Sequence, residues 1–274
     1  TMQRYLPSGF GYKYFSSPFV AATVNEFTNE LITLLYRYDE NRLVSGIPAT
    51  GWVNYKIIAN VLNPLAGYAV NFGSSAVANT IDVTGVVNNG PMSVALYNHN
   101  QIYTKGFNLI GNPYPSPIDW NVGPGWTKTN IDDALYYFKA STTDQYGGIY
   151  STYINGVSND GILNKNIIPS MQGFFVHVTD GSYPVAGTLG LDNRVRITDQ
   201  THSFMKSAYK GSVPLLRLVA CFSADTTSVD PVVVYFDDKA TTDFDSQLDA
   251  LKLFNTDTKV PNLYAVSSNG SNLS

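Results

Sequence analysis

The chain has one cysteine among 274 residues, few charges and no long apolar run. A single cysteine excludes an intrachain disulfide. Charged residues make up 14% of the chain, well below the roughly 25% of an average soluble domain. The 17 basic and 21 acidic residues give a net charge of −4, which argues against a nucleic-acid partner because phosphate binding needs clustered cations. No apolar stretch approaches the roughly 20 residues of a membrane span, so none is expected.

Motifs of catalytic and metal sites are scarce as well. The three histidines are His99, His177 and His202. None has a cysteine or a second histidine at ligand spacing, so the sequence does not support zinc chemistry. The nucleophile elbow, the phosphate-binding loop and the dinucleotide fingerprint are missing. The acid pairs Asp132-Asp133 and Asp237-Asp238, if they lie on strands, point to opposite faces and cannot flank one glycosidic bond. Catalytic acids from distant positions remain possible in a β fold.

Alternation of period two is the dominant pattern along the chain and predicts short β-strands. The expected strands cover residues 34–38, 56–62, 68–72, 81–87, 93–97, 107–110, 134–139, 149–154 and 173–179. Asn-Gly, Asp-Gly and Asn-Pro turns separate them, and these residues tolerate tight reversals. His177 alternates with Val176 and Val178, so it is expected on the polar face of its strand. The pattern predicts an all-β fold, a jelly-roll-like antiparallel β-sandwich.

A locally basic stretch near residues 195–212 indicates a boundary between modules. We expect a sandwich domain over residues 1–200, a solvated linker over 201–212 and the start of a second β-sandwich over 213–274. In the second module Leu216, Leu218, Ala220 and Phe222 face one way on the first strand. Residues 245–254 predict a helix of one or two turns. The pattern predicts a new strand at the point where the chain ends, so we expect a module truncated at its C-terminus.

Aromatic residues are abundant and are the best candidates for ligand contacts. The 3 Trp, 19 Tyr and 14 Phe accompany many neutral Asn side chains and little charge. Sugar rings stack on exposed aromatic faces, and Asn and Tyr groups hydrogen-bond hydroxyls. We therefore expect carbohydrate binding at Trp52, Trp120 and Trp126. The alternative is that these rings fill the core of the sandwich, as most aromatic side chains do.

An acidic cluster follows residue 236 and is the only candidate for a cofactor, a structural calcium ion. Calcium prefers several carboxylate and carbonyl oxygens on an adaptable loop. The candidate ligands are Asp243, Asp245 and Asp249. The spacing is not that of an EF-hand, and solvated turn acids with a helix N-cap explain the cluster equally well.

The segment Gly106–Trp120 reads GFNLIGNPYPSPIDW, with three prolines at alternate positions. Each proline fixes its own φ and keeps the preceding residue out of the helical region, so an extended crossing is expected. This segment resembles one found in very large secreted proteins of Bacteroidetes that are exported by the type IX secretion system. Further similar stretches are Tyr14–Val24, Leu35–Glu40 (LYRYDE), Ile167–Val176 (IIPSMQGFFV) and Val234–Leu253, which holds Phe244, Asp245, Asp249, Ala250 and Lys252.

The resemblance implies a region near the C-terminus of an exported protein, extracellular or on the outer cell surface. It implies contact with the secretion machinery through a C-terminal part that this chain lacks, and it carries over no catalytic residue. We therefore expect a non-catalytic structural or adhesive module whose partner is a polysaccharide or another cell-surface glycan. Two alternatives remain open: part of a polysaccharide-degrading enzyme, or a module that assembles or interacts by strand pairing.

Overall fold

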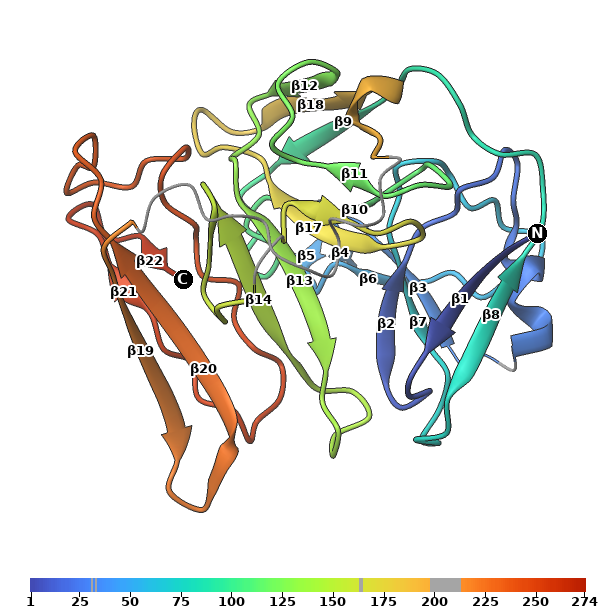
Figure 1. Ribbon diagram of the computed structural model, residues 1–274, viewed down its shortest axis with the longest axis horizontal. Coiled ribbons are helices and arrows are strands. Elements are labelled where there is room, and N and C mark those ends of the chain that lie inside the picture. The colour runs from blue at the N-terminus through green and yellow to red at the C-terminus, as the bar shows by residue number, and fades with distance from the viewer. Residues whose placement is uncertain (31, 33, 163–164, 198–212) are drawn as a thin grey trace. The chain divides into compact units, whose positions relative to one another are not determined.

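A computed structural model describes residues 1–30, 32, 34–162, 165–197 and 213–274. The chain divides into two compact units, each built from two stretches of sequence. Unit 1 comprises Thr1–Ile131 and Ile167–Thr198, and unit 2 comprises Asp132–Asn166 and Asp199–Ser274. Strands and short 3-10 turns account for all regular structure in the described ranges (Figure 1). The predicted all-β class with antiparallel sheets is confirmed.

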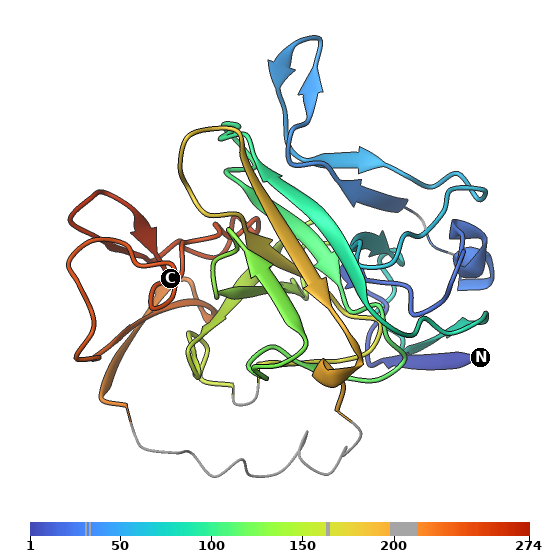
Figure 2. The ribbon, with the colours of Figure 1, turned by 90° about the horizontal axis from the view of Figure 1, so that it is seen from above.

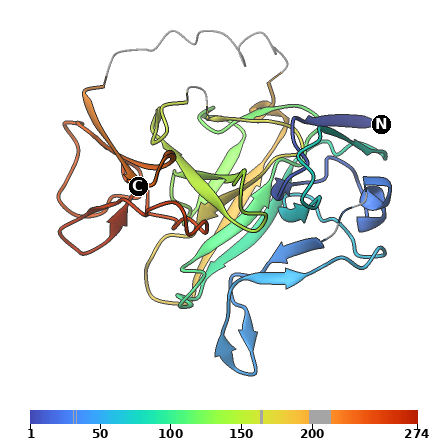
Figure 3. The same ribbon diagram turned by 90° about the horizontal axis from the view of Figure 1, so that it is seen from below.

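Unit 1 contains a four-stranded antiparallel sheet in the order β2-β7-β3-β6. Its strands are β2 (Tyr12–Phe15), β7 (Tyr68–Asn71), β3 (Leu34–Tyr38) and β6 (Trp52–Asn54). Side chains alternate across these strands, so Leu35 and Val70 on one face are fully buried. The strands β4 (Leu43–Val44) and β5 (Ile47–Pro48) form a hairpin between β3 and β6, which projects from the sheet in Figures 2 and 3.

The main hydrophobic core of unit 1 lies between this sheet and a second antiparallel pair, β1 (Met2–Leu6) and β8 (Asn79–Val83). Leu6, Ile81 and Val83 from the pair meet Phe15 and Leu35 from the sheet in one cluster. The 3-10 turn η1 (Val24–Glu30) adds Val24 and Phe27 to the same cluster. Two strand layers packed through alternating apolar side chains form a sandwich.

Three further sets of strands complete unit 1. They are β10 (Phe107–Gly111) with β17 (Gly173–His177), β11 (Ile118–Asp119) with β16 (Ile167–Ile168), and the three-stranded sheet β12-β18-β9. The last consists of β12 (Trp126–Thr129), β18 (Val185–Leu191) and β9 (Met92–Asn98), with the 3-10 turn η2 (Asn193–Val195) after β18. Strand β17 is buried on both faces, so its period-two pattern carries no polar side.

Unit 2 is also antiparallel. It contains β13 (Leu135–Ala140), β14 (Gly148–Ile154) and β15 (Val157–Ser158), which pair in that order. A long hairpin, β19 (Leu215–Phe222) with β20 (Asp225–Tyr235), and a short one, β21 (Ala265–Val266) with β22 (Asn272–Leu273), make up the rest.

Several details differ from the expectations. Residues 132–166, expected in the first domain, group with the C-terminal unit. Residues 56–62 form a turn with one isolated bridge at Val61 and no strand. Ile57 and Ile58 are exposed, so this stretch does not place a row of apolar side chains in the core. The expected helix at 245–254 is a single turn closed by the bond from Asp249 N to Asp245 O. The expected linker over 201–212 lies outside the described residues.

Candidate functional site

Trp120 is a core residue of unit 1 and presents no ring face to a ligand. Its side chain is 2% exposed. The ammonium of Lys128 lies 3.6 Å from the ring centroid, and the ring of Trp126 meets it edge-on at 4.8 Å. A cation over an indole face is a stabilising contact. The prediction that Trp120 stacks on a sugar is therefore wrong, because packing and a lysine already cover its faces.

Trp126 is half-buried on β12, where the sequence analysis also expects a sugar contact. Its indole Nε1 donates to the carbonyl of Asp119 at 2.8 Å, which fixes the ring. The edge-on contact with Trp120 occupies part of its surface. Trp126 keeps some accessible surface, but among the described residues no second accessible aromatic ring lies next to it.

The proline-rich crossing that carries the family resemblance is fixed by hydrogen bonds of the buried Asn112 side chain. Asn112 is fully buried, accepts from the Tyr114 backbone N–H at 2.9 Å and donates to the Ser116 carbonyl at 2.9 Å. The same amide nitrogen lies 3.1 Å from the Ile168 carbonyl and 3.0 Å from the Pro169 carbonyl. One side chain thus ties the NPYPS turn to the segment before the QGFF strand.

Two more side chains hold this crossing in place. The hydroxyl of Tyr114, a fully buried residue, donates to the carbonyl of Gly90 at 2.5 Å. Arg196, counted above in the basic stretch, donates to Ser116 Oγ at 2.8 Å, and its guanidinium lies 5.3 Å from the Tyr114 ring centroid. Arg196 is therefore built into unit 1.

Trp52 belongs to a group of aromatic side chains on the four-stranded sheet, on the face opposite the core cluster. Tyr38 lies directly across the ladder from Trp52, with ring centroids 5.0 Å apart. Tyr36 is on the same face of β3, and Tyr12 from β2 approaches it at 6.3 Å. These four side chains are half-buried. We call Tyr12, Tyr36, Tyr38 and Trp52 the aromatic face.

Buried residues packed against the aromatic face hold two of its rings, Tyr38 and Trp52, in position. Phe175 of β17 meets Tyr38 at 4.9 Å and Trp52 at 6.2 Å, both edge-on. Tyr14 contacts Trp52 at 5.7 Å. Gly51 lies against the Tyr38 ring so closely that a Cβ there would stand 2.5 Å from Tyr38 Cζ. Two of the four rings, Tyr38 and Trp52, are therefore preorganised by packed neighbours.

Glu40 closes one end of the sheet, at the last residue of the LYRYDE motif. Its buried carboxylate accepts from the His99 backbone N–H at 2.8 Å and contacts His99 Nδ1 at 2.7 Å. Its carbonyl accepts from the Thr104 hydroxyl at 2.6 Å. Sequence reasoning treats Glu40 and His99 as unrelated, because 59 residues separate them. The pair anchors the loop after β9.

The calcium candidates lie in the turn that follows β20. Asp249 Oδ2 accepts from the Asp245 backbone N–H at 2.8 Å, and Asp245 Oδ1 accepts from the Gln247 N–H at 2.9 Å. Burial raises the pKa of the Asp249 carboxyl above its ordinary value. The backbone carbonyl of Asp243 accepts a hydrogen bond from the Thr241 hydroxyl. The described ranges contain no group of three or more acidic, histidine or cysteine side chains that could hold a metal ion.

The two acid pairs lie in turns, not on strands. Asp132 is buried and precedes β13, and the Asp133 N–H donates to the Ser246 carbonyl at 3.0 Å. Asp237 follows β20 and caps its own turn by accepting from the Lys239 N–H at 2.9 Å. His177 is 1% exposed, with Nε2 2.9 Å from the Lys105 carbonyl. The prediction of a polar strand face for His177 is wrong, because both faces of β17 are covered.

Unit 2 contains one group with a nucleophile next to charged residues. Lys165 Nζ contacts both Ser151 Oγ and, at 2.5 Å, Asp160 Oδ2, and Ser151 donates to the same carboxylate at 2.9 Å. Burial lowers the pKa of Lys165. Burial alone would raise the pKa of Asp160, but the Lys165 hydrogen bond and charge outweigh it and lower that pKa. Lys165, Ser151 and Asp160 hydrogen-bond one another, and none of them lines the cavity of unit 2.

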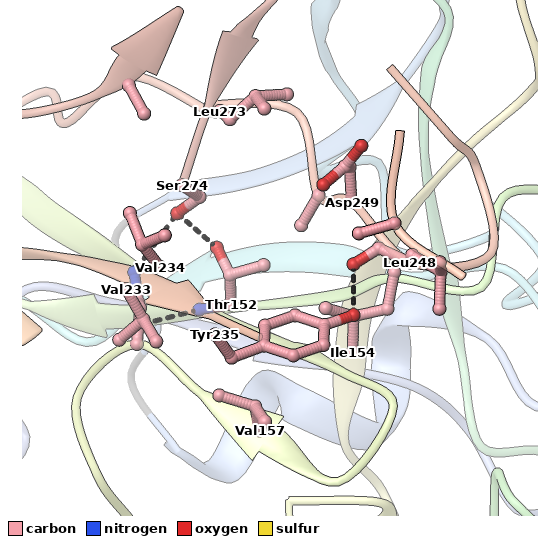
Figure 4. A pocket seen from close by; sticks show the side chains of 14 residues that line it. Thr152, Ile154, Val157, Val233, Val234, Tyr235, Leu248, Asp249, Leu273 and Ser274 are labelled. Carbon is pink, nitrogen blue, oxygen red and sulfur yellow. Dashed lines mark hydrogen bonds between the residues drawn. The ribbon is translucent and has the colours of Figure 1, made fainter. Parts of the chain in front are cut away.

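A cavity of about 160 Å³ lies in unit 2 among β14, β15, β20 and the C-terminal hairpin (Figure 4). Its walls are mainly apolar, with Ile154, Val157 and Leu273 among the lining residues. The polar groups at its edge bond one another: Ser274 Oγ lies 2.8 Å from Thr152 Oγ1, and the Tyr235 hydroxyl donates to the Leu248 carbonyl at 2.5 Å. The cavity is small, and these groups are already engaged.

A protein-family model described as a domain of unknown function, DUF8693, matches residues 1–272. The chain is a member of the DUF8693 family. No curated protein and no solved structure matches it. None of the helices in the described part of this DUF8693 chain is both long and apolar enough to cross a membrane. Three tryptophans were expected to bind sugar. Trp52 lies beside other half-buried aromatic rings, Trp126 has no such rings next to it among the described residues, and Trp120 is buried.

Proposed function

We propose that this DUF8693 chain is a non-catalytic structural and adhesive module of an exported protein, and that its aromatic face binds glycan. The aromatic face carries the proposal. It groups four half-buried rings from three strands of one sheet, and buried residues fix the positions of Tyr38 and Trp52. The similarity of the NPYPS and QGFF segments to proteins exported by the type IX system supports a place outside the cell.

Sugars fit this surface for a physical reason. The C–H face of a pyranose is apolar and packs on aromatic rings, while tyrosine hydroxyls bond the equatorial hydroxyls. Tyr36 supplies such a group on the same face of the sheet as the indole of Trp52. Low charge limits competition from ionic binding, since only 14% of the residues are charged. A neutral polysaccharide is therefore the ligand class that the aromatic face favours.

The test is a glycan array with the whole chain, followed by titration of each hit. Trp52→Ala and Tyr36→Ala are expected to weaken binding at least tenfold. Tyr183→Ala is the matched control, because Tyr183 is an exposed aromatic residue on a different part of unit 1. The glycan proposal fails if no glycan binds, or if all three variants bind like the parent. Release of new reducing ends during the titration would instead support the polysaccharide-degrading alternative.

A second candidate function, assembly by strand pairing, is favoured by the hairpin β19–β20. In the described residues β19 pairs only with β20, and both of its faces carry exposed apolar side chains. Leu218 is 49% exposed and Val219, on the opposite face, is 56% exposed. The single charge on β19, Arg217, is bonded to the Ser158 and Asn159 carbonyls and does not guard the edge. An unguarded apolar edge is a template for another strand.

The partner we propose for this edge is a second copy of the chain. Two β19 strands related by a two-fold axis place apolar side chains against apolar side chains on both faces, with no opposed free charge. Light scattering should report a dimer for the parent chain and a monomer for Leu218→Lys. Val86→Lys changes an exposed residue in unit 1 and should stay dimeric. A monomeric parent chain at high concentration would eliminate this candidate.

A further inference from the structure

Unit 2 buries an ion pair that the functions discussed above do not use. Asp230 lies on β20, and Lys252 lies in the segment that precedes the C-terminal hairpin. Lys252 Nζ is 2.6 Å from Asp230 Oδ2, and both side chains are 1% exposed. A buried ion pair loses the hydration of both charges, so it is stable only when further hydrogen bonds satisfy the remaining donors and acceptors.

The surroundings of this pair supply little of that compensation. Asp230 Oδ2 also accepts from the Leu263 backbone N–H at 2.6 Å, but Oδ1 has no donor among the described residues. Lys252 Nζ carries three N–H donors in its charged form, and Asp230 Oδ2 is its single hydrogen-bond acceptor in the described part of the chain. Burial lowers the pKa of Lys252, which favours the neutral amine.

We propose that Lys252 and Asp230 condense to an intramolecular amide cross-link. An amide has one N–H and one carbonyl oxygen, in place of three donors and a two-oxygen carboxylate. The condensation removes Oδ2 and keeps Oδ1 as the carbonyl oxygen of the amide. The neutral amide removes both buried charges, whose desolvation is the largest cost of the pair.

The reaction needs no external reagent. A proton first moves from the ammonium of Lys252 to the carboxylate of Asp230 along their 2.6 Å hydrogen bond, which produces an amine and a carboxylic acid. The lone pair of Nζ attacks Cγ of Asp230, the N–C bond forms, and the negative charge develops on Oδ1. The Leu263 N–H donates to the protonated Oδ2 and assists its departure. The C–OH bond then breaks, and the hydroxyl leaves with one proton from nitrogen as water.

The fold holds both reacting groups in position. Asp230 sits opposite Ala220 in the β19–β20 ladder, and the Lys252 backbone N–H donates to the Asn272 carbonyl at 2.7 Å. Fixed backbones on both sides convert the condensation into a proximity-driven step. The product would close a loop between positions 22 residues apart and covalently tie β20 to the C-terminal segment. It does not depend on the proposed glycan binding.

The test is the intact mass of the whole chain under denaturing conditions. The parent chain is expected to be lighter than its sequence by one water, and protease digestion should yield a branched peptide joining Asp230 to Lys252. Lys252→Met should have the full mass. Lys165→Met is the matched control: its ion pair with Asp160 is partly exposed, so this variant should still lose water.

The measurement also separates the cross-link from another dehydration. Asp160 precedes Gly161, and cyclisation of an Asp-Gly bond to a succinimide also removes one water. A succinimide would persist in Lys252→Met and would map to the peptide that contains Asp160. A parent chain with its full mass, a water loss that survives in Lys252→Met, or a branched peptide at any other pair overturns the proposal. The parent mass is decisive even if the variant fails to fold.

Discussion

Replacing Asn112 by alanine should destabilise unit 1 severely. The buried side chain accepts from the Tyr114 N–H and donates toward the carbonyls of Ser116, Ile168 and Pro169. Alanine removes these bonds and leaves at least one buried N–H and one buried carbonyl without a partner. Each such group costs about 1–3 kcal/mol, so we expect a loss of roughly 3–5 kcal/mol. That is a large fraction of the about 5–15 kcal/mol that stabilises an ordinary domain.

Urea denaturation followed by tryptophan fluorescence measures this loss in unit 1 alone, because all three tryptophans lie there. With a slope of about 2–3 kcal/mol per molar urea, the midpoint should fall by about 1–2 M. Asn108→Ala is the matched control: its amide nitrogen bonds the Tyr97 and Gly106 carbonyls at a partly exposed site. A midpoint for Asn112→Ala equal to that of the control would refute the reasoning.

Two further perturbations test the packing and the electrostatics. Gly67→Ala should cost about 1–3 kcal/mol by the same fluorescence assay, because its Cβ would stand 2.5 Å from the Ile110 carbonyl oxygen, whereas Gly123→Ala, which meets open space, should be neutral. Asp160→Asn should cost about 1 kcal/mol or less near neutral pH, since Lys165 lowers the pKa of that carboxyl in the folded state. A carboxyl with a lowered folded pKa stabilises above its unfolded pKa, so the cost should shrink as the pH falls below about 3.9. Denaturation followed by circular dichroism across this range would contradict the assignment if the cost did not depend on pH.

Local patterns in the sequence were sufficient to predict the fold class and several strands, but not β1, β6, β12 or β18. The alternation in residues 34–38 correctly placed Tyr36 and Tyr38 on one face and Leu35 on the other, because period two is a property of the extended backbone. The pattern in residues 56–62 was misleading: this stretch bonds residues 22–25 through a few backbone groups and one isolated bridge, and a turn interrupts it before a strand can form. Sequence reasoning also could not separate Trp52 from Trp120, because an indole looks the same in a core and on a surface.

The sequence by itself determined that this chain is an antiparallel β protein without disulfides, because strand period, turn chemistry and cysteine content are local properties. Tertiary structure alone decided which residues share a site. It grouped Trp52 with tyrosines from β2 and β3, joined Glu40 to His99, and buried Asp230 against Lys252. The physical reason is that ladder pairing in a β fold brings together residues far apart in sequence, and burial, charge pairing and ring contacts depend on those long-range neighbours.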